Sequence, residues 1–448
     1  MVSDRPGVPG GVVVCRPGFA CVALCQHKPE LRGTLIMSGT QMAPDERRGS
    51  LQSERHFPTI ASAVSAATPL ASLNLNWRER DLPEKERTKH VHRLHPYLGK
   101  FIPQLVEVFL RKYFQAGQTV LDPFCGSGTC LVQANELAIN SIGYDISAFN
   151  VLLCRAKTGQ YDLAKVQREV LEVLENVRAT TQPERAQLRL FEPSSVYHTI
   201  SMTDSEYLQL WFAPQALREL LTYRNFLESG RYEYEDLLKI ILSRSARSAR
   251  LTTHFDLDFP KQPQTEAYWC YKHSRACSPT QEAFKFIERY SIDTIKRIQQ
   301  FARVRTVATV DVVHGDSREV EIPPVDGVVT SPPYVGLIDY HDQHAYAYHL
   351  LGLQDRRSAE IGAAANGSSL KAREKYQEDI ALVFERVAAS MPCGGRMIVV
   401  ANDRANLYPE IAKIAGMETE DVVTRHVNRR TGRRFTEFYE SVFIWRKR

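Results

Sequence analysis

The stretch Thr119-Val120-Leu121-Asp122-Pro123-Phe124-Cys125-Gly126-Ser127-Gly128-Thr129 predicts a buried strand, a glycine turn and the start of a helix. The glycines allow a tight turn and let a ligand come close to the main chain. A second strand is predicted at 141–145, and it ends in Asp145, 23 positions after Asp122. An acid about 20 residues beyond a glycine turn is placed to accept hydrogen bonds from ribose hydroxyls. The two segments predict an α/β fold with a nucleotide-like ligand at its strand ends.

The spacing of the glycines narrows the class of ligand. It is not Gly-x-Gly-x-x-Gly, and no Gly-Lys-Ser/Thr follows, so NAD and ATP loops both fit poorly. The pattern Asp-Pro-Phe-x-Gly-x-Gly-Thr instead resembles motif I of S-adenosylmethionine-dependent methyltransferases; an ordinary strand-turn-helix with structural glycines is the alternative. The resemblance implies the Rossmann-like α/β fold of class I methyltransferases with S-adenosylmethionine as cofactor. It also implies cofactor contacts from Asp122, Phe124, Gly126, Gly128, Thr129, Asp145 and Ile146.

The second motif is Thr330-Ser331-Pro332-Pro333-Tyr334, which follows a predicted buried strand at 325–329. Because both prolines fix φ and donate no backbone hydrogen bond, they make a stiff lip with the carbonyl of Ser331 or Pro332 pointing outward. Oxygens at such a lip can accept the protons of a planar amine while the Tyr334 ring stacks on its face. Alone, a Pro-Pro-Tyr segment is equally consistent with a turn or a proline-rich ligand.

This segment resembles motif IV of the DNA amino-methyltransferases, in the Ser-Pro-Pro-Tyr version typical of the cytosine-N4 group. The resemblance implies site-specific methyl transfer to the N4 amine of a cytosine flipped out of double-stranded DNA, without a covalent intermediate or a metal. Adenine-N6 methylation of DNA, methylation of an RNA base amine, and an inactive scaffold that binds DNA remain alternatives. The sequence leaves open whether a cognate restriction endonuclease is a partner. The catalytic residues implied are Ser331, Pro332, Pro333 and Tyr334.

Two shorter segments agree with the same family. Residues 95–103 precede a predicted helix and resemble motif X, which closes over the methionine end of the cofactor and implies contacts from Tyr97, Lys100 and Phe101. Asp316 lies in a segment that resembles motif III, which implies that it reaches the adenine amine; a turn aspartate is the alternative. The motif order resembles the α arrangement, except that α enzymes usually carry the large insert after motif III.

Arginines recur in two places that favour contact with DNA phosphates. One set recurs every third residue, so its members would line one face of a helix. The other surrounds a Thr-Gly turn between two predicted strands at 421–427 and 438–445. Arginine suits bidentate phosphate contacts, but a solvated or salt-bridged surface is the alternative for both sets. The predicted DNA-binding residues are Arg244, Arg247, Arg250, Arg429, Arg430 and Arg433.

Two groups of metal-binding residue types stand out, and neither predicts a metal site. His90, His92 and His95 lie close in sequence, but no cysteine or acid completes a familiar ligand spacing there. Cys270, His273 and Cys277 could supply three zinc ligands. Because no fourth ligand is apparent in the sequence, no metal is expected.

The chain divides unevenly along its length. Residues 1–75 lack steady periodicity and are expected to be mostly disordered. Residues 76–150 carry the cofactor motifs and 309–448 the catalytic motif. Residues 151–308 far exceed a usual crossover, so an inserted helical domain is predicted there as the candidate target-recognition region. The helices expected within it are Leu163–Val177, Pro214–Leu227, Tyr234–Arg250 and Pro279–Phe301.

Composition bounds the class of protein. The 448 residues are 43% hydrophobic and 24% charged, enough for one large or two ordinary domains with real cores. A net charge of +5 permits nucleic-acid binding without requiring it. Nine cysteines form no dense disulfide framework, which fits a reducing cytoplasm. No apolar run is long enough to span a bilayer, so a membrane protein is not expected.

Overall fold

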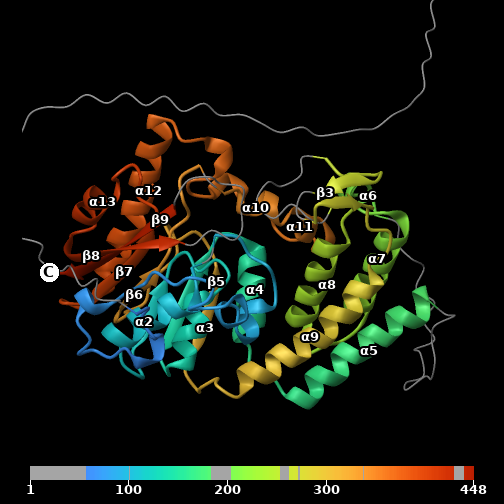
Figure 1. Ribbon diagram of the computed structural model, residues 1–448, viewed down its shortest axis with the longest axis horizontal. Coiled ribbons are helices and arrows are strands. Elements are labelled where there is room, and N and C mark those ends of the chain that lie inside the picture. Colours follow the sequence, from blue (N-terminus) through green and yellow to red (C-terminus); the bar gives the residue numbers. More distant parts are fainter. Residues whose placement is uncertain are drawn as a thin grey trace, which may run out of the picture. The chain divides into compact units, whose positions relative to one another are not determined.

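The computed structural model describes residues 57–99, 101–182, 203–252, 262–270, 273–336, 338–427 and 438–448. Its centre is a seven-stranded sheet in the order β5-β2-β1-β6-β7-β9-β8 (Figure 1). The strands β1, β2, β5, β6 and β7 run parallel, while β9 is antiparallel to both of its neighbours. The strand bounds are β1 Thr119–Asp122, β2 Asn140–Asp145, β5 Val310–His314, β6 Gly327–Thr330, β7 Arg396–Ala401, β8 Met417–Val427 and β9 Phe438–Lys447. This is the Rossmann-like α/β fold that the glycine turn predicted.

The strand order alone predicts where a ligand binds, without reference to any side chain. After β1 the chain adds β2 and β5 on one side, and it then returns to add β6 on the other side of β1. Open parallel sheets bind ligands beyond the carboxyl ends of the strands at such a switch point. Asp122, Asp145 and Thr330 are the last residues of β1, β2 and β6, so they end at this edge.

Alternate residues along the strands feed two cores on opposite faces of the sheet, as the period-two geometry of a strand requires. Val120 and Val329 pack with α2 (Pro103–Tyr113) and α3 (Thr129–Glu136). Leu121 pairs in register with Val328, and both pack with the helices of the other face. Those helices are α12 Leu370–Ala389 and α13 Tyr408–Ile414.

Residues 57–75 correct the expectation of disorder up to residue 75. They contain the short 3₁₀ helices η1 (Ala61–Ala63) and η2 (Leu70–Ser72), and Ala61 and Val64 are buried in the core that α2 covers. The indole of Trp77 donates a hydrogen bond to the carbonyl of Thr59 at 2.9 Å. The sequence of this segment does not reveal the packing, because its apolar residues are interspersed with small and polar ones and show no steady period. Residues 1–56 lie outside the described ranges.

The helices of the insert pack into one hydrophobic core, which also includes Val91, Val132 and Tyr346 from outside residues 151–308. Figure 1 shows its helices gathered beside one another, apart from the β7–β9 end of the sheet. All four helices predicted there are confirmed within a few residues. The first insert-side helix, α4 (Ala148–Thr158), packs on β2 and β5 and therefore belongs to the sheet as its ordinary crossover helix. The remaining elements are α5 Leu163–Thr181, α6 Glu206–Trp211, α7 Pro214–Ser229, α8 Glu235–Ala249, α9 Phe284–Ala302, and a hairpin of β3 Tyr268–Cys270 and β4 Arg275–Cys277.

The segment that follows β6 joins the insert to the sheet. It contains α10 (Tyr340–Gln343) and α11 (Ala345–Leu351), and α11 packs against α8. Tyr346 and Leu350 are buried in the core of the insert. The other short helices are α1 Glu84–Arg87, η3 His90–Arg93, η5 Arg357–Ala359 and η6 Ala364–Asn366. Of the helices in the described ranges, none has the length and apolarity needed to cross a membrane.

Candidate active site

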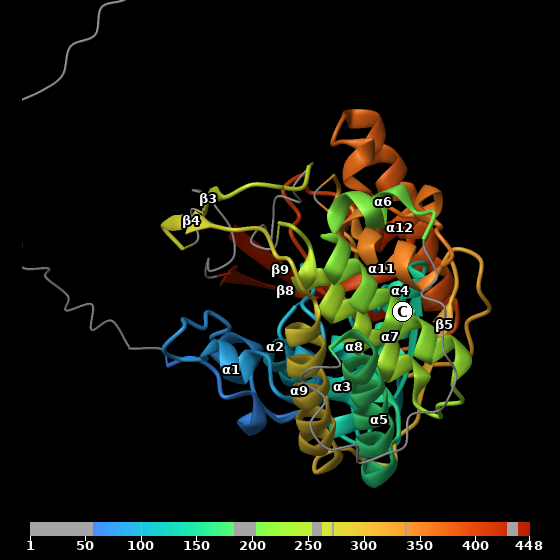
Figure 2. The same cartoon turned by 90° about the vertical axis from the view of Figure 1, so that its right-hand side faces the viewer.

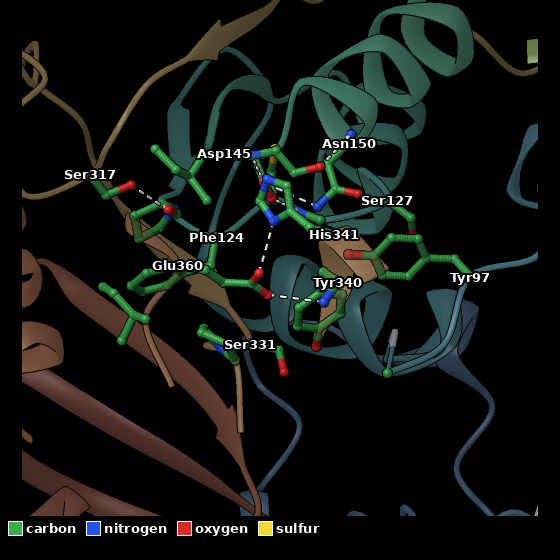
Figure 3. A pocket seen from close by; sticks show the side chains of 18 of the residues that line it. Tyr97, Phe124, Ser127, Asp145, Asn150, Ser317, Ser331, Tyr340, His341 and Glu360 are labelled. Carbon is green, nitrogen blue, oxygen red and sulfur yellow. Dashed lines mark hydrogen bonds and ion pairs between the residues drawn. The ribbon is translucent and has the colours of Figure 1, made fainter. Parts of the chain in front are cut away.

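A cavity of about 770 Å³ opens at the carboxyl ends of β1, β2, β5 and β6. Figure 3 shows the side chains of Tyr97, Asp145, Glu360 and Ser331 around it. Ten of the predicted site residues line the cavity: Tyr97, Phe101, Phe124, Gly126, Thr129, Asp145, Ile146, Asp316, Ser331 and Pro333. Lys100, which was also predicted, lies outside the described residues.

The two glycines of the turn have different functions. Gly126 lines the cavity at φ +49°, and a Cβ there would come within 3.3 Å of the Tyr97 hydroxyl. Gly128, at φ +73°, lies behind the wall, where a Cβ would be 2.9 Å from the Cys154 sulfur on α4. Gly128 does not line the cavity but allows α4 to pack closely on the turn; its contact with a cofactor stays a prediction. Gly126 keeps main chain exposed to a ligand.

Asp145 lines the cavity and accepts three hydrogen bonds from the residues around it. Its carboxylate accepts from the amides of Gly126 (2.8 Å) and Ser147 (2.8 Å) and from the Asn150 side chain (3.0 Å). Burial raises the pKa of Asp145 to about 6, and the three hydrogen bonds oppose that rise. The group is thus ionised at neutral pH and stands on the wall of the cavity. A carboxylate in this position fits the hydroxyl pair of a ribose.

Asp122 does not line the cavity, and its contact with a cofactor stays a prediction. It is 1% exposed, and its Oδ1 accepts hydrogen bonds from the Thr330 hydroxyl (2.6 Å) and the Phe124 amide (3.2 Å). Burial raises the pKa of Asp122 to about 7 against these hydrogen bonds. Its Oδ2 has no hydrogen-bond partner among the described residues. Asp122 therefore links the end of β1 to the residue that precedes Ser331.

The Ser-Pro-Pro-Tyr lip is divided between two cavities. Ser331 and Pro333 line the first, whereas Pro332 is buried and lines neither cavity. Tyr334 lines a second cavity of about 930 Å³ together with Tyr376 and residues 402–405. The Tyr376 hydroxyl donates to the Pro333 carbonyl at 2.8 Å, and this contact fixes the lip from behind.

The Tyr334 hydroxyl donates to Glu440 Oε1 at 3.0 Å. Burial, then the neighbouring Glu440 charge, raises the pKa of Tyr334 well above its ordinary value, so the phenol stays protonated. Arg425 forms a buried ion pair with the same carboxylate, with its Nε 2.8 Å from Oε2. The ring of Tyr334 is thus fixed through its hydroxyl and cannot swing into the first cavity without breaking that hydrogen bond.

Asp316 lines the far wall, at the end of β5. Arg318 holds it through a forked pair of hydrogen bonds, with Nη2 to Oδ2 at 2.6 Å and Nε to Oδ1 at 3.0 Å. Burial acts to raise the pKa of Asp316, but the Arg318 hydrogen bonds outweigh it, and the net pKa is lowered. The neighbouring Ser317 hydroxyl donates to the Pro123 carbonyl at 2.5 Å, which joins this wall to the glycine turn.

An aromatic wall closes the side opposite Asp316. Tyr97 stacks on Tyr340 with ring centroids 5.8 Å apart, and on His344 at 5.5 Å. Burial raises the pKa of Tyr97 well above its ordinary value, as do the nearby Tyr340 and Asp145. The wall therefore joins the segment before α2 to the helices after β6.

The cavity residues that reasoning from the sequence missed include Tyr340, His341 and Glu360. Glu360 Oε2 lies 2.8 Å from His341 Nδ1, and its Oε1 accepts from the Tyr340 amide at 3.1 Å. Both His341 and Glu360 are buried. No motif marks them, although the run of aromatic and histidine residues at 340–349, directly after the lip, was a usable signal.

The arginines of α8 and its C-terminus turn inward, which corrects their predicted exposure to DNA. Arg244 is 8% exposed; its Nη1 lies 2.8 Å from Asp293 Oδ2 and its guanidinium 4.1 Å from the Tyr290 ring centroid. Arg250 is 3% exposed and lies 5.0 Å from the Tyr346 ring centroid. Arg247 is partly exposed and remains a prediction. Arg429, Arg430 and Arg433 lie outside the described residues.

Comparison with known proteins gives consistent results. A family model described as DNA methylase matches residues 57–153. The Type II methyltransferase M.MjaII of Methanocaldococcus jannaschii is 36% identical over 430 residues, covering 81% of this chain and 81% of that protein. The Type II methyltransferase M.BsoBI of Geobacillus stearothermophilus is 22% identical over 330 residues, covering 66% and 59%. Among solved structures, the rRNA methyltransferase aviRa of Streptomyces viridochromogenes is 11% identical in sequence, with a TM-score of 0.32. The match covers 83% of this chain and 96% of that protein.

Proposed function

The chain belongs to the N4/N6 amino-methyltransferase family of DNA methylases, whose cofactor is S-adenosylmethionine, and we propose that it methylates the N4 amine of cytosine in double-stranded DNA. The observation that carries this proposal is that Ser331 and Pro333 of the lip line the same cavity as Gly126 and Asp145 of the cofactor motifs. A methyl donor and an amine bound there would lie side by side.

Each wall of the cavity suits one part of the cofactor. Asp145 would accept the ribose hydroxyls, and Ile146 and Asp316 would contact the adenine from the ends of β2 and β5. Tyr97 and Phe101 would cover the methionine end from the segment before α2. When bound, S-adenosylmethionine supplies a methyl group on a positively charged sulfur. The side chains that surround it would exclude water and fix its orientation. This positioning lowers the entropic part of the activation barrier for methyl transfer.

The lip would activate the amine. The lone pair of an exocyclic amine is delocalised into the ring, so the amine is a poor nucleophile. A hydrogen bond from the NH₂ group to the Ser331 hydroxyl, which lines the cavity, would pull the nitrogen toward tetrahedral geometry and free that lone pair. Asp122 is a positioning residue here, because its hydrogen bond with Thr330 holds the residue before Ser331. Transfer is then direct and requires no cysteine nucleophile.

The target base would enter from the side of the second cavity. A base in a stacked duplex is out of reach, so it must be flipped out. Tyr334 lines the second cavity, and its ring is held by the hydrogen bond to Glu440, which makes it the stacking partner we propose. The helical insert is proposed as the region that reads the target sequence. A cognate restriction endonuclease is proposed as a partner.

Cytosine is proposed over adenine because the lip begins with Ser331 where a residue such as Asp or Asn is the common alternative. This is a correlation within the family, since any of these side chains can accept a hydrogen bond. Adenine-N6 methylation therefore uses the same cavity and the same chemistry. Identification of the methylated nucleoside distinguishes cytosine from adenine as the target base.

Product analysis tests the proposal. Purified protein is incubated with S-adenosylmethionine and unmethylated bacterial DNA, the DNA is digested to nucleosides, and the products are identified by mass spectrometry, with Ser331→Ala as control. N4-methylcytosine that disappears in the variant is the expected result. N6-methyladenine would overturn the base assignment while leaving the site intact. Product on RNA alone would overturn the DNA substrate.

A further inference from the structure

The β3–β4 hairpin of the insert brings together three residues that bind soft metal ions. Figure 2 shows this hairpin reaching out beyond the helices of the insert. The sulfur atoms of Cys270 and Cys277 and a ring nitrogen of His273 all lie within 4.8 Å of one another. His273 Nδ1 is 3.4 Å from the Cys277 sulfur. In sequence the set is Cys-x-x-His-x-x-x-Cys, whose spacing alone gave no reason to expect an ion.

The strand register explains why the two sulfurs converge. Tyr268 pairs with Cys277 and Cys270 pairs with Arg275, so the two cysteines are diagonal neighbours on one face of the hairpin. Diagonal neighbours in an antiparallel pair have Cα atoms about 7–8 Å apart. A disulfide usually needs a Cα separation of roughly 4.4–6.8 Å, so the register favours an atom between the sulfurs over a bond that joins them. Both thiols are free.

The turn supplies the third ligand. The His273 amide donates to the Cys270 carbonyl at 3.1 Å, which closes the turn, and Ser274 follows at φ +50°. This brings the imidazole back over the face that carries the cysteines. With Zn–S bonds of about 2.3 Å and Zn–N bonds of about 2.0 Å, the edges of a tetrahedral site are about 3.8 Å for S···S and about 3.5 Å for S···N. The observed 3.4 Å between His273 and Cys277 matches the second of these.

We propose that the hairpin binds one zinc ion through the sulfur atoms of Cys270 and Cys277 and through Nδ1 of His273. Two thiolates and one imidazole select zinc over magnesium or calcium, which prefer oxygen ligands. Three protein ligands leave the fourth tetrahedral position to water or another oxygen or nitrogen donor. Cys270 is 4% exposed while His273 is exposed, so the ion would lie at the rim of the hairpin, within reach of solvent.

The ion would stabilise an element that is weak by itself. The hairpin has two strands of three residues, and two-stranded hairpins are marginal in water. Metal binding adds folding free energy because the site does not exist in the unfolded chain. The face opposite the cysteines presents Trp269, which is 55% exposed. The zinc site would therefore hold a large exposed aromatic ring in a fixed position on the insert.

A second group of metal-binding residue types lies between η3 and α3 and is a weaker candidate for a metal site. His90, His92 and Glu136 also converge. There, however, Lys89 Nζ lies 2.6 Å from Glu136 Oε2, so a cation already neutralises the carboxylate. His92 Nε2 is within 3.0 Å of the Gln133 side chain. We assign no metal to this group.

Metal content of the full chain tests the proposal independently of methyl transfer. The protein is produced in zinc-supplemented medium, passed through a desalting column, and measured by plasma mass spectrometry. About one zinc per chain is expected for the wild type and for Cys393→Ser, an exposed cysteine outside the hairpin. Cys270→Ser and Cys277→Ser should lose most of it. No zinc in the wild type, or equal zinc in all four proteins, overturns the proposal.

Two further readouts guard against a variant that fails to fold. Cofactor titration of Cys277→Ser should match the wild type, since the cavity is built from other elements. X-ray absorption at the zinc edge of the wild type should show two sulfur neighbours at about 2.3 Å and lighter neighbours at about 2.0 Å. A shell of oxygen and nitrogen atoms alone would place the zinc elsewhere and overturn the assignment.

Discussion

The strand ends of the sheet and the helices of the insert place their polar and charged residues in opposite ways. Asp145 and Ser331 follow parallel strands and reach the cavity at the sheet edge. Arg244 and Arg250 share a helical spacing but turn into the core of the insert. The end of a parallel strand fixes where a side chain emerges, because all such ends meet at one edge. Helical spacing tells which residues share a face, but not whether another helix covers it.

The largest effect is expected where a charge is buried in the insert. Arg244→Ala should lower the free energy of unfolding by about 3 kcal/mol, because it leaves Asp293 without its closest partner and removes the contact with Tyr290. Chemical denaturation measures the loss. The exposed Arg218→Ala on α7 is the control and should stay within about 0.5 kcal/mol. A stable Arg244→Ala protein with weakened DNA binding would restore the original phosphate assignment.

The matching change at the strand ends should lower cofactor affinity, and it also costs some stability because a buried hydrogen bond is lost. Asp145→Asn replaces an acceptor-only carboxylate with an amide that must turn its NH₂ toward at least one of the donors around it. S-adenosylmethionine affinity is expected to fall roughly 10- to 100-fold, the value of one or two hydrogen bonds to a charged group. Isothermal titration calorimetry measures it, with the exposed Asp311→Asn on β5 as control. Equal losses in both variants would mean that Asp145 has no specific contact.

The two glycines sharpen the comparison within a single turn. Gly128→Ala should cost about 1–2 kcal/mol of stability, because the backbone is left-handed and the new methyl group meets the Cys154 sulfur. Gly126→Ala carries left-handed strain as well, but its new methyl group would be 3.3 Å from the Tyr97 hydroxyl at the cavity, so it should cost less stability and also weaken cofactor binding. Thermal unfolding and cofactor titration of both variants separate the effects. The reverse assignment of losses would contradict the placement of the wall.

The smallest effect is a pH dependence. Because burial raises the pKa of Asp145 to about 6, the carboxylate is ionised at pH 7.5 and about 90% protonated at pH 5. If the ionised form binds ribose, cofactor affinity should fall about tenfold as pH drops from 7.5 to 5. Stability has the opposite sign: the raised pKa makes this group's contribution to folding less favourable as pH rises from about 3.8 to about 6. An affinity that is flat with pH would exclude Asp145 as the ribose ligand.

Much of the fold was predictable from particular residues. The apolar runs before Gly126, Asp145 and Ser331 became neighbouring strands, and the expected helices of the insert formed nearly as bounded. These features are local, because the spacing of apolar residues and the positions of glycine and proline determine them within a short stretch of sequence. The predicted hairpin at the sheet edge also formed, as β8 and β9.

What was not predictable depends on packing between distant segments. The sequence predicted Asp122 as a cofactor ligand. In the structure its side chain accepts a hydrogen bond from Thr330, which is 208 residues away, and it does not line the cavity. Glu360 enters the cavity only because the segment after β6 folds back over it. The grouping of Cys270, His273 and Cys277 required the register of a hairpin whose strands are too short to show a pattern.

The central claim is that Ser331 of the catalytic lip lines the same cavity that binds the cofactor. The most direct test is to measure S-adenosylmethionine binding and single-turnover methyl transfer to DNA on the same preparation of Ser331→Ala. Cofactor affinity should stay within about twofold of the wild type while the rate of transfer falls roughly 100-fold or more, as for loss of one oxyanion-type contact. A variant that transfers methyl groups at the wild-type rate would contradict the account, because Ser331 would then lie apart from the reacting amine.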